Sequence, residues 1–424
     1  MRSQVVIGGT MIDCIYCLKT KKESEEHVVP AGLGGDDRDW LLKDCVCSEC
    51  NTVTFSPLEL KFLRSSPIAI ARLFKQPSTR KSGSQRGVPT VQPGASYLAD
   101  PETQTLLEQE LLAGGEPLIL SQLVLQPPRE VHLHSANLES GREFISSLVK
   151  ILGLEVQLVR KFREGIEIRF EVTRLMWMQP DERYDQDGDA EIFSKAPNGA
   201  KSMIWMEGLD GPQSALKEFK LPPRVFQKSS GQFVCKVESP AHVPVLLSIM
   251  RPQLQTLVVP DDVPVVMNDA PGIHQQYNFS MAAHDRVLAK IGMNLCAKIF
   301  GADFVRQSEF NTVRDYVHSG SGHILKIPID KLPADDPFAE QLDHHVFVLT
   351  SLPVPAERCA ALVFQAKLYD GPMEHFILAK FGDRQAAISE TMVIVNDYRQ
   401  HRIECRTIAG WEEIAREQDD SRCH

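Results

Sequence analysis

The sequence has no uninterrupted apolar run of about 18 residues, which excludes a conventional membrane-spanning helix. Its first residues do not combine a basic stretch with a long apolar segment, so no secretory signal is expected and the chain is predicted to be cytoplasmic. Cysteine is scarce, with 10 among 424 residues, which argues against a disulfide scaffold. Internal repeats and a glycine-rich phosphate loop are also lacking. The remaining composition, 43% hydrophobic and 24% charged, is that of an ordinary globular protein.

The charge is unevenly distributed. The net charge of −10 argues against a surface that binds nucleic acid everywhere. Residues 1–99 nevertheless carry 13 Lys and Arg against 10 Asp and Glu, and the stretch 60–99 has seven basic residues and no acidic one. This asymmetry favours a basic N-terminal module on an acidic body, although a solvated linker would have the same composition.

The chain is long enough for two or three domains. We predict a small domain over residues 1–75 that ends in two short helices interrupted by Pro67. A basic linker rich in Pro, Ser and Gly follows over 76–100. Residues 101–424 are expected to form a larger mixed α+β region, with room for two subdomains, that serves recognition, regulation or oligomerisation.

Hydrophobic periodicity and turn residues predict the elements of this larger region. Helices are expected over 102–113, 141–152, 282–300 and 308–318. Strands are expected over 166–178, 344–350, 359–368, 374–381 and 391–397, and a surface loop over 181–191. The predicted fold class is α+β.

Two C-x-x-C pairs lie in one polar N-terminal segment, separated by 29 residues. Each pair can fold as a knuckle that turns two thiolates toward one centre, and two knuckles complete a tetrahedral set of sulfur ligands. Such a site suits structural Zn²⁺, because zinc is redox-inert and is satisfied by four soft ligands. The predicted zinc ligands are Cys14, Cys17, Cys47 and Cys50.

Polar residues with a characteristic spacing accompany the knuckles. Glu26, His27 and Pro30 lie between them, followed by Gly34-Gly35, and Asn51 comes directly after the last cysteine. This segment resembles the zinc-containing form of the HNH endonuclease family, which has the order C-x-x-C, [DE]-H-x-x-P, G-G, C-x-x-C-N. The resemblance covers about 60 residues at the N-terminal end of the chain and implies a ββα-metal fold.

The resemblance also implies roles for these residues. By the family's pattern, His27 is the general base, and Glu26 and Asn51 hold a catalytic Mg²⁺ or Mn²⁺ ion. The chain departs from the pattern at residues 41–42, where the family's middle Asn should orient the base and two leucines stand instead. Either a backbone carbonyl, Asp39 or Asp44 takes that role, or the base is less well oriented than in the family.

The implied reaction is hydrolysis of a DNA phosphodiester, with RNA as an open alternative. Histidine can accept a proton from water near neutral pH, and hard oxygen ligands suit Mg²⁺ or Mn²⁺. Basic residues after the motif could contact backbone phosphates without reading sequence. The candidates for these contacts are Lys61, Arg64, Arg72 and Lys75.

Several readings of function stay open at this point. By analogy, such a nuclease would suit bacterial defence against foreign DNA, and the large body could sense an activating ligand or form a homo-oligomer. The competing hypothesis is a catalytically silent zinc module that docks on nucleic acid or a protein partner, and the missing middle Asn is its best support.

Overall fold

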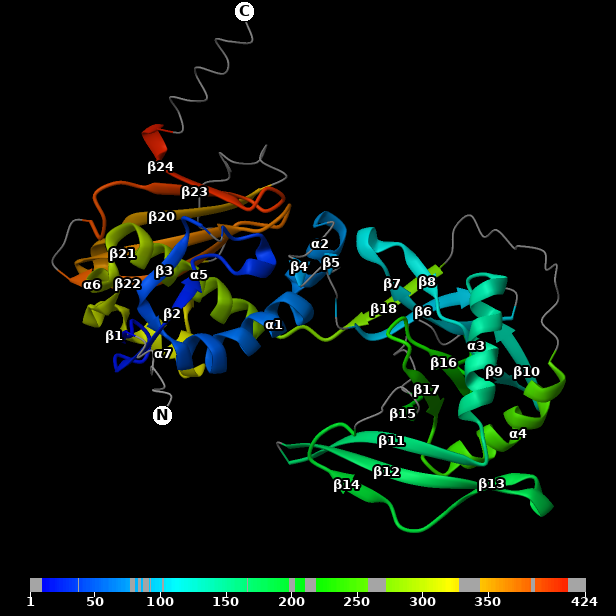
Figure 1. Cartoon of the computed structure of the whole chain (residues 1–424). Helices are drawn as coiled ribbons and strands as arrows, with labels where there is room; N and C mark the ends of the chain where they lie inside the picture. Colours follow the sequence, from blue (N-terminus) through cyan, green and yellow to red (C-terminus); the bar gives the residue numbers. More distant parts are fainter. Residues whose placement is uncertain are drawn as a thin grey trace, which may run out of the picture. The chain divides into compact units, whose positions relative to one another are not determined.

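The structure is a computed structural model. It describes residues 10–36, 38–76, 81–82, 85–86, 91, 93–100, 103–165, 167–197, 203–209, 219–257, 272–327, 344–382 and 386–410 (Figure 1). The chain divides into two compact units. Unit 1 comprises Met1–Gln92, Ala113–Gly115 and Asn278–His424, and unit 2 comprises Pro93–Leu112 and Glu116–Tyr277. This division does not follow the boundaries expected near residues 75 and 100, because the N-terminal segment shares a unit with the C-terminal one.

The N-terminal part of unit 1 is a small antiparallel sheet followed by helices. Its strands are β1 (Met11–Asp13), β2 (Thr20–His27) and β3 (Leu41–Cys47), in the order β1-β2-β3. A π-helical turn, Cys50–Phe55, leads into α1 (Ser56–Ser65), and α2 (Pro67–Lys75) follows. Ser66 is extended and Pro67 opens α2, so the interruption expected at this proline is confirmed. A short hairpin, β4 (Lys81–Ser82) with β5 (Gln85–Arg86), lies in the predicted linker, most of whose first 17 residues fall outside the described ranges.

The C-terminal part of unit 1 supplies a six-stranded antiparallel sheet and several helices. The sheet order is β19-β22-β21-β20-β23-β24. The strands are β19 (Leu325–Lys326), β20 (His345–Val354), β21 (Cys359–Lys367), β22 (Glu374–Gly382), β23 (Met392–Asp397) and β24 (Arg402–Thr407). The helices are α5 (Met281–Phe300), α6 (Ala302–Arg306) and α7 (Asn311–Ser319). Four of these strands were predicted and are confirmed, whereas β19 and β24 were not anticipated.

Helix α5 is buried on every side. The Ser280 hydroxyl caps its N-terminus, and Gly301 ends it with a positive φ of 93°. Every residue from 287 to 297 is buried. One hydrophobic core joins residues of the small sheet, of α1 and α5, and of the six-stranded sheet. The helix is buried around its whole circumference there, because α5 contacts both the N-terminal elements and the C-terminal sheet (Figure 1).

Unit 2 is built around a large mixed sheet in the order β10-β9-β16-β17-β15-β11-β12-β13, with β14 also paired to β12. The strands are β9 (Gln122–Gln126), β10 (Glu130–His134), β11 (Glu155–Glu164), β12 (Glu167–Met178), β13 (Arg183–Gln186), β14 (Glu191–Phe193), β15 (Ile204–Gly208), β16 (Arg224–Gln227) and β17 (Phe233–Val237). Helices α3 (Leu138–Ile151) and α4 (His242–Thr256) share its core. A second sheet contains β18 (Gly272–Tyr277), β6 (Pro93–Asp100), β7 (Thr105–Leu111) and β8 (Pro117–Ile119).

Two predictions in unit 2 are wrong. The helix expected over 102–113 is the strand β7, in which the buried Glu108 accepts hydrogen bonds from the Lys236 ammonium at 3.0 and 3.1 Å. Leu, Glu and Gln favour a helix locally, but the pairing of β7 with β6 and β8 overrides that preference. The loop expected over 181–191 contains β13. The α+β fold class, helix 141–152 and strand 166–178 are confirmed. None of the described helices is long and apolar enough to cross a membrane.

Candidate functional site

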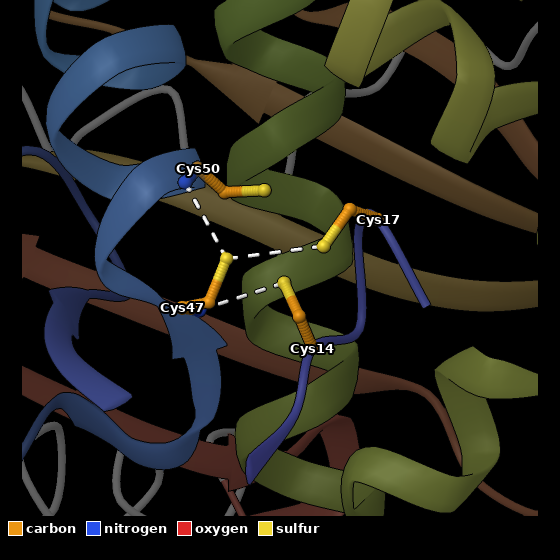
Figure 2. Close-up of side chains that lie close together, drawn as sticks. All are labelled: Cys14, Cys17, Cys47 and Cys50. Carbon is orange, nitrogen blue, oxygen red and sulfur yellow. Dashed lines mark hydrogen bonds between the residues drawn. The ribbon is translucent and has the colours of Figure 1, made fainter. Parts of the chain in front are cut away.

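The four knuckle cysteines converge on one centre. Their sulfur atoms all lie within 4.8 Å of one another, and the side chains point inward from two separate turns (Figure 2). The Cys17 and Cys47 sulfurs are 3.8 Å apart. The first knuckle connects β1 to β2, and the second follows β3, so the pairing of β2 with both strands brings the two turns together.

Backbone N–H groups point at these sulfurs. Cys14 Sγ accepts from the N–H groups of Tyr16 at 3.4 Å and Cys47 at 3.5 Å, and Cys47 Sγ accepts from the N–H of Cys50 at 3.5 Å. A hydrogen bond from the Cys50 thiol, reinforced by backbone donors, lowers the pKa of Cys14 to about 4, and the same contact raises the pKa of Cys50. Four soft donors with N–H···S support have the composition of a structural zinc site.

Cys45 lies outside the cluster. Its thiol donates to the backbone carbonyl of Lys43 at 3.1 Å, and burial raises the pKa of the thiol. The half-buried side chain packs against the core of unit 1.

Strand β2 carries both central residues of the polar motif. His27 pairs with Leu41 and Glu26 with Leu42, next to an irregularity between Ser24 and Glu26. His27 is half-buried, whereas Glu26 is only 3% exposed. This agrees with the alternation of side chains along a strand, which directs neighbouring residues to opposite faces.

Asn51 joins the start of the helical segment to the same strand. Its side-chain amide donates to the backbone carbonyl of Glu25 at 2.8 Å and to the hydroxyl of Ser24 at 2.9 Å. Asn51 is half-buried. Asn51 is therefore bound to β2 at Glu25, two residues before His27.

Glu26 is engaged in a buried ion pair. The Lys290 ammonium on α5 donates to the Glu26 carboxylate and, at 2.7 Å, to the carboxylate of Glu59 on α1. Lys290 is fully buried. Burial raises the pKa of Glu26, against the opposing effect of Lys290. Burial alone would lower the pKa of Lys290, but the two carboxylates raise it. The carboxylate expected to hold a catalytic ion is thus already compensated by a lysine.

The four basic candidates for phosphate contact separate into two groups. Lys61 and Arg64 are exposed on α1. Arg72 is 5% exposed, and its Nε donates to the backbone carbonyl of Gly32 at 3.0 Å, so it braces the turn after the motif. Lys75 forms an ion pair with Asp370. The phosphate contact expected for Arg72 is not supported, because its side chain is buried.

A second group of metal-type ligands lies elsewhere in unit 1. His284, Asp285 and Glu374 place their ligand atoms within 4.8 Å of one another. The Lys326 ammonium bridges the two carboxylates, at 2.5 Å from Asp285 and 3.3 Å from Glu374. His284 bonds Glu374 at 2.5 Å. This cluster compensates its own charges without a metal ion.

Sequence reasoning missed Lys290 and Asn294 on α5. The two residues stand four positions apart on one helix face and are fully buried. Tyr16 donates to Asn294 Oδ1 at 2.5 Å, and Asn294 Nδ2 donates to the carbonyl of His27 at 3.0 Å. The available signal was a Lys and an Asn at i and i+4 inside a long, largely apolar helix, where an unpaired polar group is costly.

Comparison with known proteins gives no relative for this chain: no family model, no curated protein and no solved structure matches it.

Proposed function

We propose that unit 1 carries an endonuclease of the HNH type that hydrolyses phosphodiester bonds in DNA, with His27 as the general base. The observation that carries the proposal is the bond from the Asn51 amide to the Glu25 carbonyl, beside His27. It joins the first helical turn after the zinc cluster to the strand with the histidine. The order of β2, β3 and α1, with a cluster of four cysteines at their base, supports the same proposal.

In this proposal His27 accepts a proton from the attacking water. The water oxygen forms a bond to phosphorus and the bond from phosphorus to the 3′-oxygen breaks. The leaving 3′-oxygen takes a proton from solvent water, so that the products are a 5′-phosphate and a 3′-hydroxyl. An imidazole suits this role because it can take up and release a proton near neutral pH. The structural zinc would hold the two knuckles that fix β2 between β1 and β3.

The residues fit a catalytic divalent ion only in part. Asn51 is half-buried at the edge of the strand, but the Glu26 carboxylate is buried against Lys290. An ion could bind through Glu26 only if this carboxylate left its lysine. The proposal therefore assigns no step to an ion on Glu26, and metal dependence is part of the test.

Lys61 and Arg64 are the proposed contacts to the DNA backbone, because both are exposed on the helix that follows the motif. Such contacts fix the position of a duplex and carry no sequence information.

The test is cleavage of supercoiled plasmid by the full chain with Mg²⁺ or Mn²⁺, beside samples with EDTA and with the His27→Ala variant. We expect nicked or linear DNA from the wild type and intact plasmid from both controls. A competing single-stranded RNA should slow DNA cleavage little if DNA is the substrate. Intact plasmid with folded, zinc-loaded wild type would overturn the proposal.

One observation favours a second candidate, a silent zinc module that binds nucleic acid or a protein. The burial of Glu26 in an ion pair is what a motif without a catalytic ion would require. DNA binding that is weakened by loss of Lys61 and Arg64, together with no cleavage, would support this second candidate.

A further inference from the structure

The backbone at His27 is held by a side chain that lies 267 positions further along the chain. Asn294 on α5 donates to the His27 carbonyl at 3.0 Å, and a longer contact of 3.5 Å reaches the carbonyl of Val28. Asn294 is fully buried, so its amide is shielded from bulk solvent. The hydrogen bond ties α5 to the residue proposed as the general base.

The residues that face His27 and Glu26 across the sheet are apolar. His27 pairs with Leu41 and Glu26 with Leu42, and neither leucine has a polar side-chain group. Asp39 is exposed, and Asp44 is exposed with a positive φ of 58° in β3. The position that would orient the histidine from β3 is therefore apolar, and α5 supplies the missing amide.

The orientation of the Asn294 amide is fixed from both ends. Tyr16 donates its hydroxyl hydrogen to Asn294 Oδ1 at 2.5 Å, so the opposite end must be the donor to His27. Tyr16 is itself part of the first cysteine knuckle and stacks edge-on against Phe55 at 4.5 Å between ring centroids. A chain of two hydrogen bonds therefore links the zinc cluster to the backbone of His27.

Lys290 holds the preceding residue from one helical turn away. Its ammonium binds the Glu26 carboxylate, while Asn294 binds the His27 carbonyl. Two residues on one face of α5 thus bind two successive residues of β2. These two contacts hold this end of the strand in place against the helix.

We infer that Asn294 is a positioning residue for His27 and takes the place of the polar residue lacking at Leu41 and Leu42. The inference rests on the proposed function. Positioning is worth much in catalysis because a misplacement of about 1 Å can lower a rate by about 10²-fold. Asn294 touches neither substrate nor the reacting atoms in this account, and it acts through the backbone.

The test compares Asn294→Leu with Asn396→Leu in the full chain. Asn396 is the matched control, because it is also fully buried and its amide donates to a backbone carbonyl of the same segment, Leu33 at 3.2 Å. We expect Asn294→Leu to lower the single-turnover cleavage rate by about tenfold or more, with zinc content and DNA affinity unchanged. Asn396→Leu should change the rate less than threefold.

Two further readouts separate positioning from a general loss of structure. The NMR resonance of the His27 ring should shift in Asn294→Leu and stay in place in Asn396→Leu. If Asn294→Leu does not fold, Asn294→Ser keeps a small polar group there and should show a partial loss of rate with the same shift. Equal cleavage rates in the wild type and in the folded Asn294 variants would overturn the inference while the nuclease function stands. No cleavage by the wild type would remove both.

Discussion

Glu26 and Lys290 stand 264 positions apart in the chain and form an ion pair inside unit 1. The lysine side chain is fully buried and the glutamate side chain is 4% exposed. Glu59 completes the arrangement from α1. The motif would assign Glu26 to a metal ion. In the structure this residue instead forms the ion pair that joins β2 to α5.

Loss of one partner should destabilise unit 1 strongly. Lys290→Met leaves the Glu26 carboxylate buried without a cation, and we expect the free energy of unfolding to fall by about 3–5 kcal/mol. The double variant Glu26→Gln with Lys290→Met should recover part of this loss, because no buried charge remains on either residue. Urea denaturation of zinc-saturated protein measures the unfolding free energy of the single and the double variant. The loss caused by Lys290→Met should be the same with and without Mg²⁺. A loss that is clearly smaller with Mg²⁺ would contradict the account, because it would show that the ion binds the Glu26 carboxylate in place of the lysine.

The cysteine cluster should bind one zinc ion per chain. Cys47→Ser removes one of the four ligands, so we expect it to lower zinc content and the melting temperature of the protein. Cys45→Ser is the matched control, since its sulfur lies outside the cluster two positions away. Elemental analysis and thermal denaturation of both variants give the answer. Equal zinc content in the two variants would mean that the cluster is not the zinc site.

Salt dependence should separate DNA contacts from structural arginines. Lys61→Ala and Arg64→Ala should each reduce the slope of log affinity against log salt concentration by about 1, because each removes one phosphate contact. Arg72→Ala should leave the slope unchanged and lower stability, because its guanidinium braces the Gly32 carbonyl. Fluorescence anisotropy with a labelled duplex at several salt concentrations checks this. An unchanged slope in the first two variants would remove α1 from the DNA interface.

Acid should weaken unit 1 through His345. Burial lowers the pKa of His345 to about 3, helped by the neighbouring His344 and opposed by the Leu33 carbonyl. The ring is enclosed by Tyr369 and Tyr398, and its Nδ1 accepts from the Tyr369 N–H at 3.1 Å. The unfolded chain binds a proton near pH 6.5 while the folded chain does not, so stability rises with pH between about 3 and 6.5.

The expected size of this effect is about 2 kcal/mol of unfolding free energy lost between pH 7 and pH 5. His345→Gln removes the titrating group, so its stability should change less over the same interval. Urea denaturation at the two pH values compares them. Parallel losses in wild type and variant would show that His345 does not control the acid response.

The elements that were predicted correctly are those whose residue pattern depends only on residues close by in the sequence. The apolar repeat in 282–300 ends at Gly301, and the four strands between residues 344 and 397 are rich in β-branched and aromatic residues. The two cysteine knuckles have the same local character, because each is defined by a spacing of three. Strand β7 was missed because its Glu108 is satisfied by Lys236 from another strand, and no local pattern reveals that partner.

The division into two units, and the contacts that α5 makes to Glu26 and His27, depend on parts of the chain that are distant in the sequence. Unit 2 is inserted between Gln92 and Asn278, and no composition change at residue 278 indicates that the chain returns to its N-terminal unit there. Lys290 and Asn294 could be recognised as unusual in an apolar helix, but their partners could not be identified. Contacts between residues more than 260 positions apart follow from the whole fold.

The central claim is that His27 drives phosphodiester hydrolysis in unit 1. The most direct test is the ratio of plasmid nicking rate constants for wild type and His27→Ala at equal zinc content, with His132→Ala, an exposed residue of unit 2, as the matched control. The account predicts a fall of at least about 10²-fold for His27→Ala, since general base catalysis contributes rate factors of that order. The control variant should nick at the wild-type rate. Equal rates in His27→Ala and wild type would contradict the account.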